Sequence, residues 1–344
     1  MNEALIGWLA LFLAMSGLIV GAGVVLAKSG DRISDRTGLG GLLIGMVLVA
    51  AATSLPEIAV AVSAVLQGSP DLAVANLMGS NMANMALLAI VDIAYRGRVW
   101  QHVGAGHART AAVGIGLTAI AVLAIIKPFE VAIGWVGVES LIIFIGFLSL
   151  IAWTHRSPTP ALPSGEMRHA EAALSAQAPR MTSSMLRDLR SDLLRFGIAA
   201  IVILAAAPFM VSAADGIATE SGLGESFVGA SFLAFSTSLP ELSTAVAAVR
   251  IGAFDLAVGS LLGSNAFNMA IILLVDLVYL EGPVLEVVDP IQAFVGVSAI
   301  LLMSIVLAGI IHDKRTRVSR LEPSAWMTLL VYLLLMFLVW SAGS

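Results

Sequence analysis

Long apolar stretches recur along the whole chain and are separated by short polar segments. Each is about as long as the roughly 20 residues that a helix needs to cross a bilayer. Lipid offers no hydrogen-bond partners, so each is predicted to be a helix; the runs are too continuous for the alternating strands of about ten residues in a membrane barrel. The pattern predicts an all-α integral membrane protein with ten transmembrane helices. They are placed at 4–27, 40–66, 71–93, 109–127, 131–153, 194–214, 223–250, 255–279, 289–311 and 323–341.

The charged residues support the prediction of a membrane protein and indicate which side of the membrane the termini lie on. Only 12% of the residues are charged and 59% are hydrophobic, whereas about a quarter of a soluble domain is charged. Ten spans put both termini on one side, and 17 of the 18 Lys and Arg residues then fall on the other, with Lys127 the exception. Basic residues mark the cytoplasmic side, so we expect an inner-membrane protein with extracytoplasmic termini. The run at 4–27 has no basic residue in front and is interpreted as a retained helix, not a signal peptide.

A polar segment at 154–193 divides the chain and is rich in Pro, Ser and Arg. It predicts a cytoplasmic linker between a first five-helix unit, 1–153, and a second, 194–344. It is either a plain tether or, from Thr182 onward, a short amphipathic helix at the membrane surface. The absence of cysteine excludes disulfides and thiol chemistry. The expected partners are the bilayer and ions, with no nucleic acid, and nothing in the pattern requires more than a monomer.

The two units contain the same motifs. The sequence TSLPE at 53–57 returns at 237–241, and GSN at 79–81 returns at 263–265, always 184 positions later. Residues 53–92 and 237–276 are identical at 23 of 40 positions without a gap. The repeated regions span about 40–93 and 223–279. Because each unit has an odd number of spans, the second copy enters the membrane from the opposite side. This predicts inverted repeats around a central site, as in many secondary transporters.

Two acids lie deep in the predicted membrane spans. Glu57 and Glu241 occupy equivalent positions, and the interior of every span lacks a basic residue. A carboxylate at that depth is costly without a partner. The partner is therefore predicted to be a proton or a bound cation.

Further oxygen ligands surround these acids in the sequence. Pro56 and Pro240 free the carbonyls of Ala52 and Ser236. The disturbed turns also bare the carbonyls of Ala50, Thr53, Ala234 and Thr237. Hydroxyl and amide oxygens come from Ser54, Ser238, Ser80, Ser264, Asn84 and Asn268. An all-oxygen set suits hard cations such as Ca²⁺ and Na⁺, although single Ser, Thr and Asn residues in membrane helices often serve only packing.

Other intramembrane acids receive structural interpretations. Asp71 and Asp255 are expected to cap helices, and Asp92 and Asp276 lie near helix ends. Glu139 has no counterpart in the second copy and no assigned role.

With these motifs the chain resembles the sodium/calcium exchangers of the Ca²⁺/cation antiporter superfamily. Their signature is two inverted repeats, each with a G-T-S-x-P-E/D stretch followed by G-S-N-x-x-N/D. The resemblance implies that Glu57 and Glu241 bind Ca²⁺ and share Na⁺, with the carbonyls of Thr53 and Thr237 completing the Ca²⁺ shell. It assigns the remaining positions to Na⁺ or to the centre of the site: Ser54, Ser238, Ser80, Ser264, Asn84, Asn268, Ala50 and Ala234.

Two departures from the signature affect the expected function. The motif glycine is replaced by Ala52 in one copy and by Ser236 in the other. The last position is Asn in both copies, which argues against K⁺ co-transport. The favoured hypothesis is Na⁺/Ca²⁺ antiport with no cofactor; the alternative is a proton-coupled divalent-cation antiporter. A channel, or an intramembrane enzyme with two catalytic acids, is less consistent with the pattern.

Overall fold

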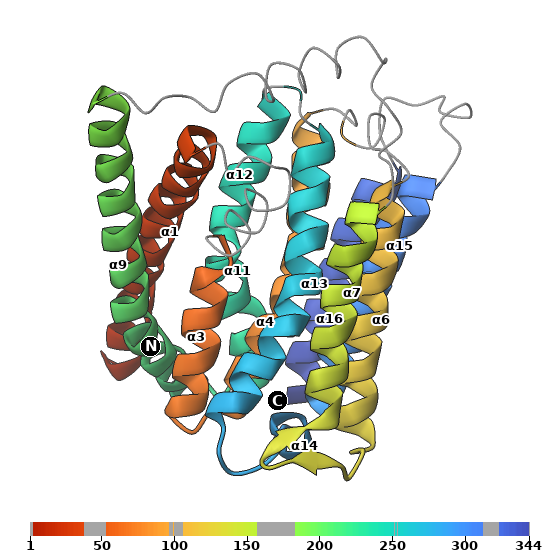
Figure 1. Cartoon of the computed structure of the whole chain (residues 1–344). Helices are drawn as coiled ribbons and strands as arrows, with labels where there is room; N and C mark the ends of the chain where they lie inside the picture. Colours follow the sequence, from red (N-terminus) through yellow and green to blue (C-terminus); the bar gives the residue numbers. More distant parts are fainter. Residues whose placement is uncertain are drawn as a thin grey trace.

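The computed structural model describes residues 3–37, 53–95, 99, 106–156, 183–250, 252, 254–311 and 323–343. Within these ranges seven helices are long and apolar enough to cross a membrane. They are α1 (Glu3–Thr37), α4 (Pro70–Ala94), α6 (Gly106–Ile126), α9 (Ser183–Ser221), α13 (Phe254–Val278), α15 (Ile291–Ile311) and α16 (Pro323–Gly343). The chain is a helical membrane protein, and its long helices lie side by side in one bundle (Figure 1).

Shorter helices complete the bundle. Two of them, α3 (Leu55–Leu66) and α7 (Val138–Arg156), are apolar but shorter than the seven candidate spans. The segment Glu225–Arg250 is broken into α10 (Glu225–Val228), the π-helix η1 (Gly229–Leu233), α11 (Ala234–Thr237) and α12 (Leu239–Arg250). It bends by 42° between Thr237 and Leu239 and counts as one further candidate span. A short helix, α14 (Val284–Val287), precedes α15.

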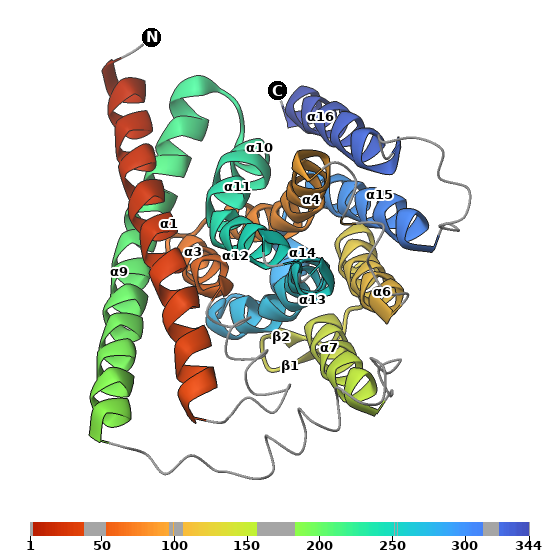
Figure 2. The same cartoon turned by 90° about the horizontal axis from the view of Figure 1, so that it is seen from above.

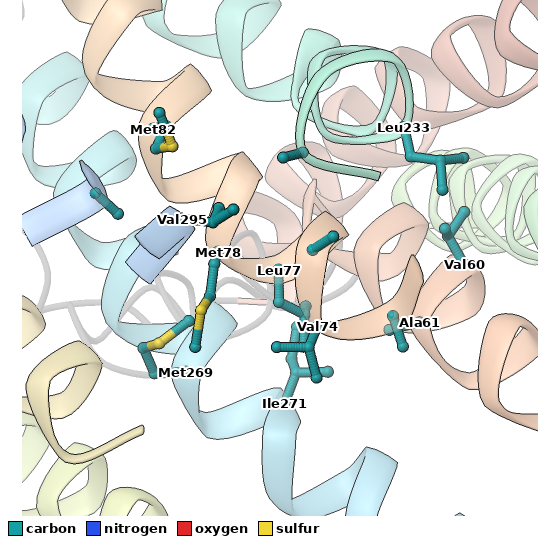
Figure 3. Close-up of a cluster of buried hydrophobic side chains, with 14 of the residues drawn as sticks. Val60, Ala61, Val74, Leu77, Met78, Met82, Leu233, Met269, Ile271 and Val295 are labelled. Carbon is teal, nitrogen blue, oxygen red and sulfur yellow. The ribbon is translucent and has the colours of Figure 1, made fainter. Parts of the chain in front are cut away.

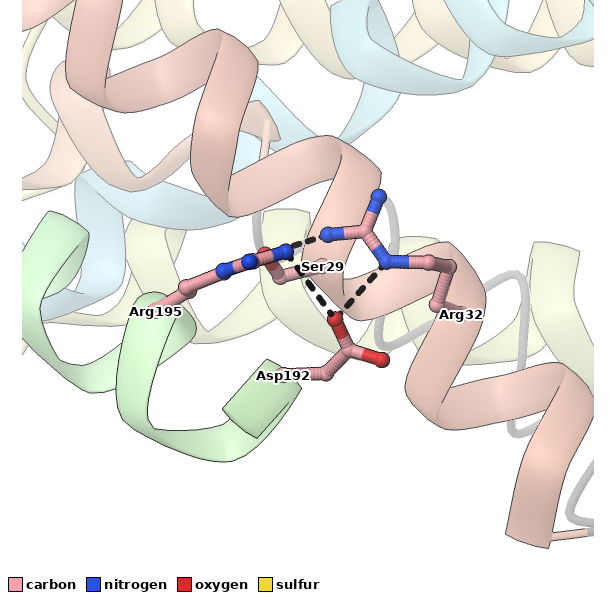
Figure 4. A network of polar contacts seen from close by, with 4 residues as sticks. All are labelled: Ser29, Arg32, Asp192 and Arg195. Carbon is pink, nitrogen blue, oxygen red and sulfur yellow. Dashed lines mark hydrogen bonds and ion pairs between the residues drawn. The ribbon is translucent and has the colours of Figure 1, made fainter. Parts of the chain in front are cut away.

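Helices of the two halves correspond in length. α3 and α12 have 12 residues each, α4 and α13 have 25, and α6 and α15 have 21. The first helices of the halves, α1 and α9, pack along each other and run in opposite directions (Figures 1 and 2). At one end of this pair Arg32 Nε donates to Asp192 Oδ1 at 2.8 Å, and Arg195 approaches the same oxygen at 3.9 Å (Figure 4).

The stretch at 131–153, predicted to be one helix, is helical only from Val138. It begins with a two-stranded antiparallel hairpin, β1 (Ala132–Ile133) and β2 (Val136–Gly137). Gly134, with φ of 69°, makes the turn and adopts the left-handed conformation that favours glycine. Asp276 fixes β2, because its Oδ2 accepts the Gly137 N–H at 2.8 Å. An apolar run alone did not reveal this long-range bond.

The last residues of the segment assigned to the linker are helical. α9 begins at Ser183, so the last residues assigned to the linker at 154–193 continue directly into the helix expected at 194–214. Polar residues such as Asp188 and Arg190 extend this helix beyond its apolar part. The amphipathic alternative from Thr182 placed a helix correctly, but as part of a longer one. Residues 157–182 lie outside the described residues.

α4 lies at the centre of the bundle, where apolar side chains of the neighbouring helices pack around it. Val74, Leu77, Met78 and Met82 of α4 pack with residues of α3, η1, α13 and α15 (Figure 3). Small residues permit the closest approach, as is usual between membrane helices. A Cβ atom on Gly79 would lie 2.5 Å from the Cα atom of Ala230, so α4 and η1 are in contact backbone to backbone.

Three of the acids that were given structural interpretations accept backbone hydrogen bonds in the helix bundle. Asp92 Oδ1 accepts the Val99 N–H at 3.1 Å, and Asp276 Oδ1 accepts the Val284 N–H at 2.7 Å, so both have the predicted structural role. The capping role expected for Asp71 was wrong, because its Oδ1 accepts the N–H of Asp289 in a distant loop at 2.8 Å. A hydrogen bond to that loop replaces capping of its own helix. The Asp255 side chain lies outside the described residues.

Candidate functional site

The helix breaks place the two acids at equivalent positions. Ser54 (φ −90°, ψ 6°) precedes α3, and Ser238 (φ −85°, ψ 1°) precedes α12. Proline follows within two residues in each copy, where its missing N–H costs no helix hydrogen bond. Glu57 and Glu241 therefore lie in the first turns of two half-helices. Unpaired N–H groups in a first turn favour negative charge.

The acids of the two halves meet in the centre of the bundle. Each is 1% exposed. The Ser238 hydroxyl donates to Glu57 Oε1 at 3.4 Å, while Thr53 and Ser54 lie beside the Glu241 carboxylate. In the part of the chain that the structure describes, no Lys or Arg forms an ion pair with either acid. Each glutamate is thus next to the Thr-Ser pair of the opposite copy.

Several oxygens around these acids have no hydrogen-bond partner among the described residues. They include Glu57 Oε2 and both carboxylate oxygens of Glu241. The hydroxyl of Ser54 and the amide oxygens of Asn84 and Asn268 also lack a hydrogen-bond partner among the described residues. Buried acceptors are normally satisfied, so this group of unpaired oxygens is suited to a cation.

Asparagines of the two repeated helices connect α4 to α13. Asn84 Nδ2 donates to Asn265 Oδ1 at 2.9 Å, and Asn268 Nδ2 donates to Asn81 Oδ1 at 3.1 Å. The repeat distance of 184 residues relates the two bonds, because Asn268 is the counterpart of Asn84 and Asn265 is the counterpart of Asn81. Because their amide groups are used as donors, Asn84 and Asn268 keep their oxygens available.

The other predicted residues that the structure describes lie in the same region. Thr53, Thr237, Ser80 and Ser264 are buried, and Ser80 Oγ and Thr237 Oγ1 lie 3.4 Å apart. The carbonyl of Ala234 already accepts bonds from Ser238 N at 3.1 Å and from Thr237 Oγ1 at 3.3 Å. Its proposed counterpart, Ala50, lies outside the described residues, as does Ala52.

Two polar residues of this region were not predicted from sequence. Asn76 is fully buried, and its Oδ1 accepts the Thr237 hydroxyl at 3.4 Å. Its position four residues before Ser80, on the same face of α4, was the available signal. Ser16 of α1 donates to the hydroxyl of Ser236 at 3.3 Å, which gives the residue that replaces the motif glycine a specific contact.

The sequence profile of the sodium/calcium exchanger protein family matches residues 6–154 and 191–341. These ranges include both halves and most of the chain. The chain belongs to this family. The family consists of secondary transporters, so this exchanger-family protein is a transporter and not an enzyme.

Known relatives of this exchanger-family protein extend over most of its length. It is 29% identical to the inner membrane protein YrbG of Escherichia coli (strain K12) over 331 residues, covering 87% of this chain and 88% of the relative. It is 25% identical to the sodium/calcium exchanger MaX1 of Methanosarcina acetivorans, covering 78% and 81% of the two chains. The name of the first relative agrees with a membrane location.

Two solved structures share the fold. The crystal structure of the H⁺/Ca²⁺ exchanger CAX superimposes with a TM-score of 0.70 at 15% identity, covering 100% of this chain and 86% of the other. The sodium-calcium exchanger NCX_Mj gives a TM-score of 0.58 at 20% identity, covering 97% and 98%. At these identities the similarity concerns the fold alone.

Proposed function

We propose that this protein is a secondary-active antiporter that exchanges Ca²⁺ for Na⁺ around Glu57 and Glu241. The observation that carries the proposal is a pair of buried carboxylates, one from each half, with unpaired oxygens and no ion-pair partner among the described residues. Membership of the sodium/calcium exchanger family supports the choice of ions. The relative named sodium/calcium exchanger supports it further.

Electrostatics explains why such a site exchanges ions. Two carboxylates balance one Ca²⁺, which leaves a neutral site in a medium of low dielectric. Na⁺ ions neutralise the same charges. An empty, doubly charged site is costly to expose to a low-dielectric interior, so the site changes orientation only when loaded. Coupled exchange follows from that requirement.

We assign the ligands according to the chemistry of each group. Ca²⁺ is held by the two carboxylates together with the carbonyls of Thr53 and Thr237, because Ca²⁺ takes six to eight oxygens. The amide oxygens of Asn84 and Asn268 face the centre. Na⁺ is bound by smaller groups of oxygens around the same acids. These are the hydroxyls of Ser54, Ser238, Ser80 and Ser264 and the carbonyls of Ala50 and Ala234.

We further propose ten spans in two inverted units, 1–153 and 194–344. The seven long helices, the bent segment Glu225–Arg250 and the short apolar helices α3 and α7 together supply ten. The opposite directions of α1 and α9 support the inversion (Figure 1). By the distribution of basic residues, both termini are extracytoplasmic and the segment between the units is cytoplasmic. The end of the bundle that carries the hairpin is then the outer end.

Proton coupling is the second candidate. Protons neutralise the same two carboxylates, and the fold of the H⁺/Ca²⁺ exchanger CAX is shared over the whole chain. In that case Ca²⁺ uptake follows a pH gradient and is independent of Na⁺.

The decisive experiment is uptake of radiolabelled Ca²⁺ into proteoliposomes under imposed Na⁺, K⁺ or H⁺ gradients. We expect uptake driven by Na⁺ and its loss to background in Glu57→Gln and in Glu241→Gln. Glu3→Gln, which removes an exposed acid at the start of α1, is the matched control and should transport normally. Full uptake in either site variant would contradict the proposal, and uptake that follows pH alone would select proton coupling.

A further inference from the structure

A second pair of buried acids lies away from Glu57 and Glu241. Glu139 is in the first turn of α7 and Asp276 is near the end of α13, and both side chains are fully buried. They lie where β2 packs against α13 and α14, at the lower end of the bundle in Figure 1. The exchange mechanism proposed above uses neither residue.

Asp276 is held as an acceptor by the backbone. Its Oδ2 accepts the Gly137 N–H at 2.8 Å and its Oδ1 accepts the Val284 N–H at 2.7 Å. Each carboxylate oxygen has about two acceptor sites, so one on each oxygen remains for another ligand. The side chain is therefore fixed in position and still able to bind a cation.

Glu139 turns back over the same glycine that binds Asp276. A Cβ atom on Gly137 would lie 2.1 Å from Glu139 Oε1 and 2.9 Å from Oε2. The backbone of Gly137 thus contacts both carboxylates, and the absence of a side chain there leaves room for Glu139. Neither oxygen of Glu139 has a hydrogen-bond partner among the described residues.

A buried hydroxyl completes the cluster. Ser140 is fully buried, and its Oγ lies beside the Asp276 carboxylate without a hydrogen-bond partner in the described ranges. The charges that act on Glu139 are those of the acids Asp276 and Glu286. Neighbouring buried acids are costly in their charged form unless a proton or a bound cation neutralises them.

We propose that Glu139, Asp276 and Ser140 form a second cation site that binds one hard divalent ion, with Ca²⁺ as the natural occupant. All the ligands are oxygens, which Ca²⁺ prefers, and two carboxylates balance its charge. The ion joins α7 to α13 next to the hairpin, so it ties the hairpin to the end of a helix that carries the central site. This site is separate from the exchange site and does not depend on which ion drives transport.

In the second half, α16 follows α15 as α7 follows α6 in the first half. The described residues of α16, Pro323–Gly343, include no Asp or Glu, so among them no carboxylate takes the part that Glu139 has in α7.

Trp135 provides a local probe of the site. Its Nε1 donates to the carbonyl of Leu277, the residue after Asp276, at 3.2 Å. Excited tryptophan transfers energy to nearby Tb³⁺, a luminescent substitute for Ca²⁺. We would measure Tb³⁺ luminescence on the full chain in detergent, with Glu57→Gln and Glu241→Gln both present to remove the central site. The signal should persist, and added Ca²⁺ should displace it.

Three variants in that background test the assignment. Glu139→Gln should lower the luminescence at least tenfold, and Ser140→Ala should weaken Tb³⁺ affinity several-fold. Trp135→Phe should remove the luminescence while binding of radiolabelled Ca²⁺ in equilibrium dialysis stays unchanged. Gel filtration and thermal melting verify folding; if Glu139→Gln does not fold, the Ser140→Ala result decides.

Either of two results would overturn the second site. One is a signal that neither Glu139→Gln nor Ser140→Ala reduces. The other is a signal that Ca²⁺ does not displace, which means adventitious Tb³⁺ only. Because this assay measures equilibrium binding without the central acids, its failure is distinguishable from a failure of Na⁺-driven transport.

Discussion

The side-chain amide of Asn84 donates a 2.9 Å hydrogen bond to the side-chain oxygen of Asn265. These residues come from different halves of the chain, and a second bond with the partners exchanged joins Asn268 to Asn81 at 3.1 Å. Two hydrogen bonds of the same kind thus fix the crossing of α4 and α13 close to the paired glutamates. The crossing holds the amide oxygens of Asn84 and Asn268 in position for a cation.

Replacing either donor asparagine of these two bonds should lower the stability of the protein by a similar amount. Asn84→Ala leaves Asn265 Oδ1 unsatisfied and Asn268→Ala leaves Asn81 Oδ1 unsatisfied. Each is expected to lower the free energy of unfolding by about 1–3 kcal/mol. Thermal unfolding in detergent checks this. A large effect for one variant with none for the other would argue against two equivalent bonds.

The contact of α4 with η1 should tolerate no added methyl group. Gly79→Ala places a Cβ atom 2.5 Å from the backbone of Ala230, and overpacking of this kind costs about 1–3 kcal/mol. Gly116→Ala is the control, because no described atom lies within 4 Å of its Cβ position. That variant should be neutral or more stable by up to about 1 kcal/mol, since alanine favours the helix. Equal melting temperatures for the two variants would contradict the close approach.

The hydroxyl pair Ser16 and Ser236 should behave as one interaction. Both side chains are nearly buried, with a separation of 3.3 Å. Ser16→Ala and Ser236→Ala should each cost about 0.5–1.5 kcal/mol, and the double variant should cost little more than either one. A double-mutant cycle of melting temperatures measures this coupling. Fully additive effects would mean that the bond does not form.

At the α1–α9 contact, Arg32 and Arg195 should differ in importance (Figure 4). Arg32 is 2.8 Å from Asp192 and 37% exposed, whereas Arg195 is 3.9 Å away and 61% exposed. Solvent screening limits even the first pair, so we expect Arg32→Ala to cost up to about 1 kcal/mol and Arg195→Ala close to nothing. Melting curves at low salt provide the comparison, and a larger loss for Arg195→Ala would reverse the assignment.

The sequence predicted the central features because they depend on local chemistry. Apolar length identified the long helices, and the prolines before Glu57 and Glu241 predicted helix breaks where the structure has them. Ser54, Ser238, Asn84 and Asn268 were identified because they occupy equivalent positions in the two repeats. Their assignment as ligands remains a prediction.

Features that depend on contacts between distant residues were not predictable. The hairpin at 132–137 is held by Asp276, 139 residues away, and an apolar run does not reveal such a partner. The start of α9 was placed too late because polar residues continue a helix beyond its apolar part. Asn76 was overlooked because its partner, Thr237, lies in the other half.

The reciprocal asparagine bonds have a consequence for the balance between inward-open and outward-open forms. Under the proposed inversion, exchanging the roles of the two halves converts each bond into the other, so the pair stabilises both forms equally. Any resting preference must arise where the halves differ. Two such places are Ser236, which contacts Ser16, and Glu139 of α7, because the described residues of α16 include no acid. Substitutions there should shift the resting ratio of inward-open to outward-open transporter, whereas the reciprocal asparagine bonds favour neither form.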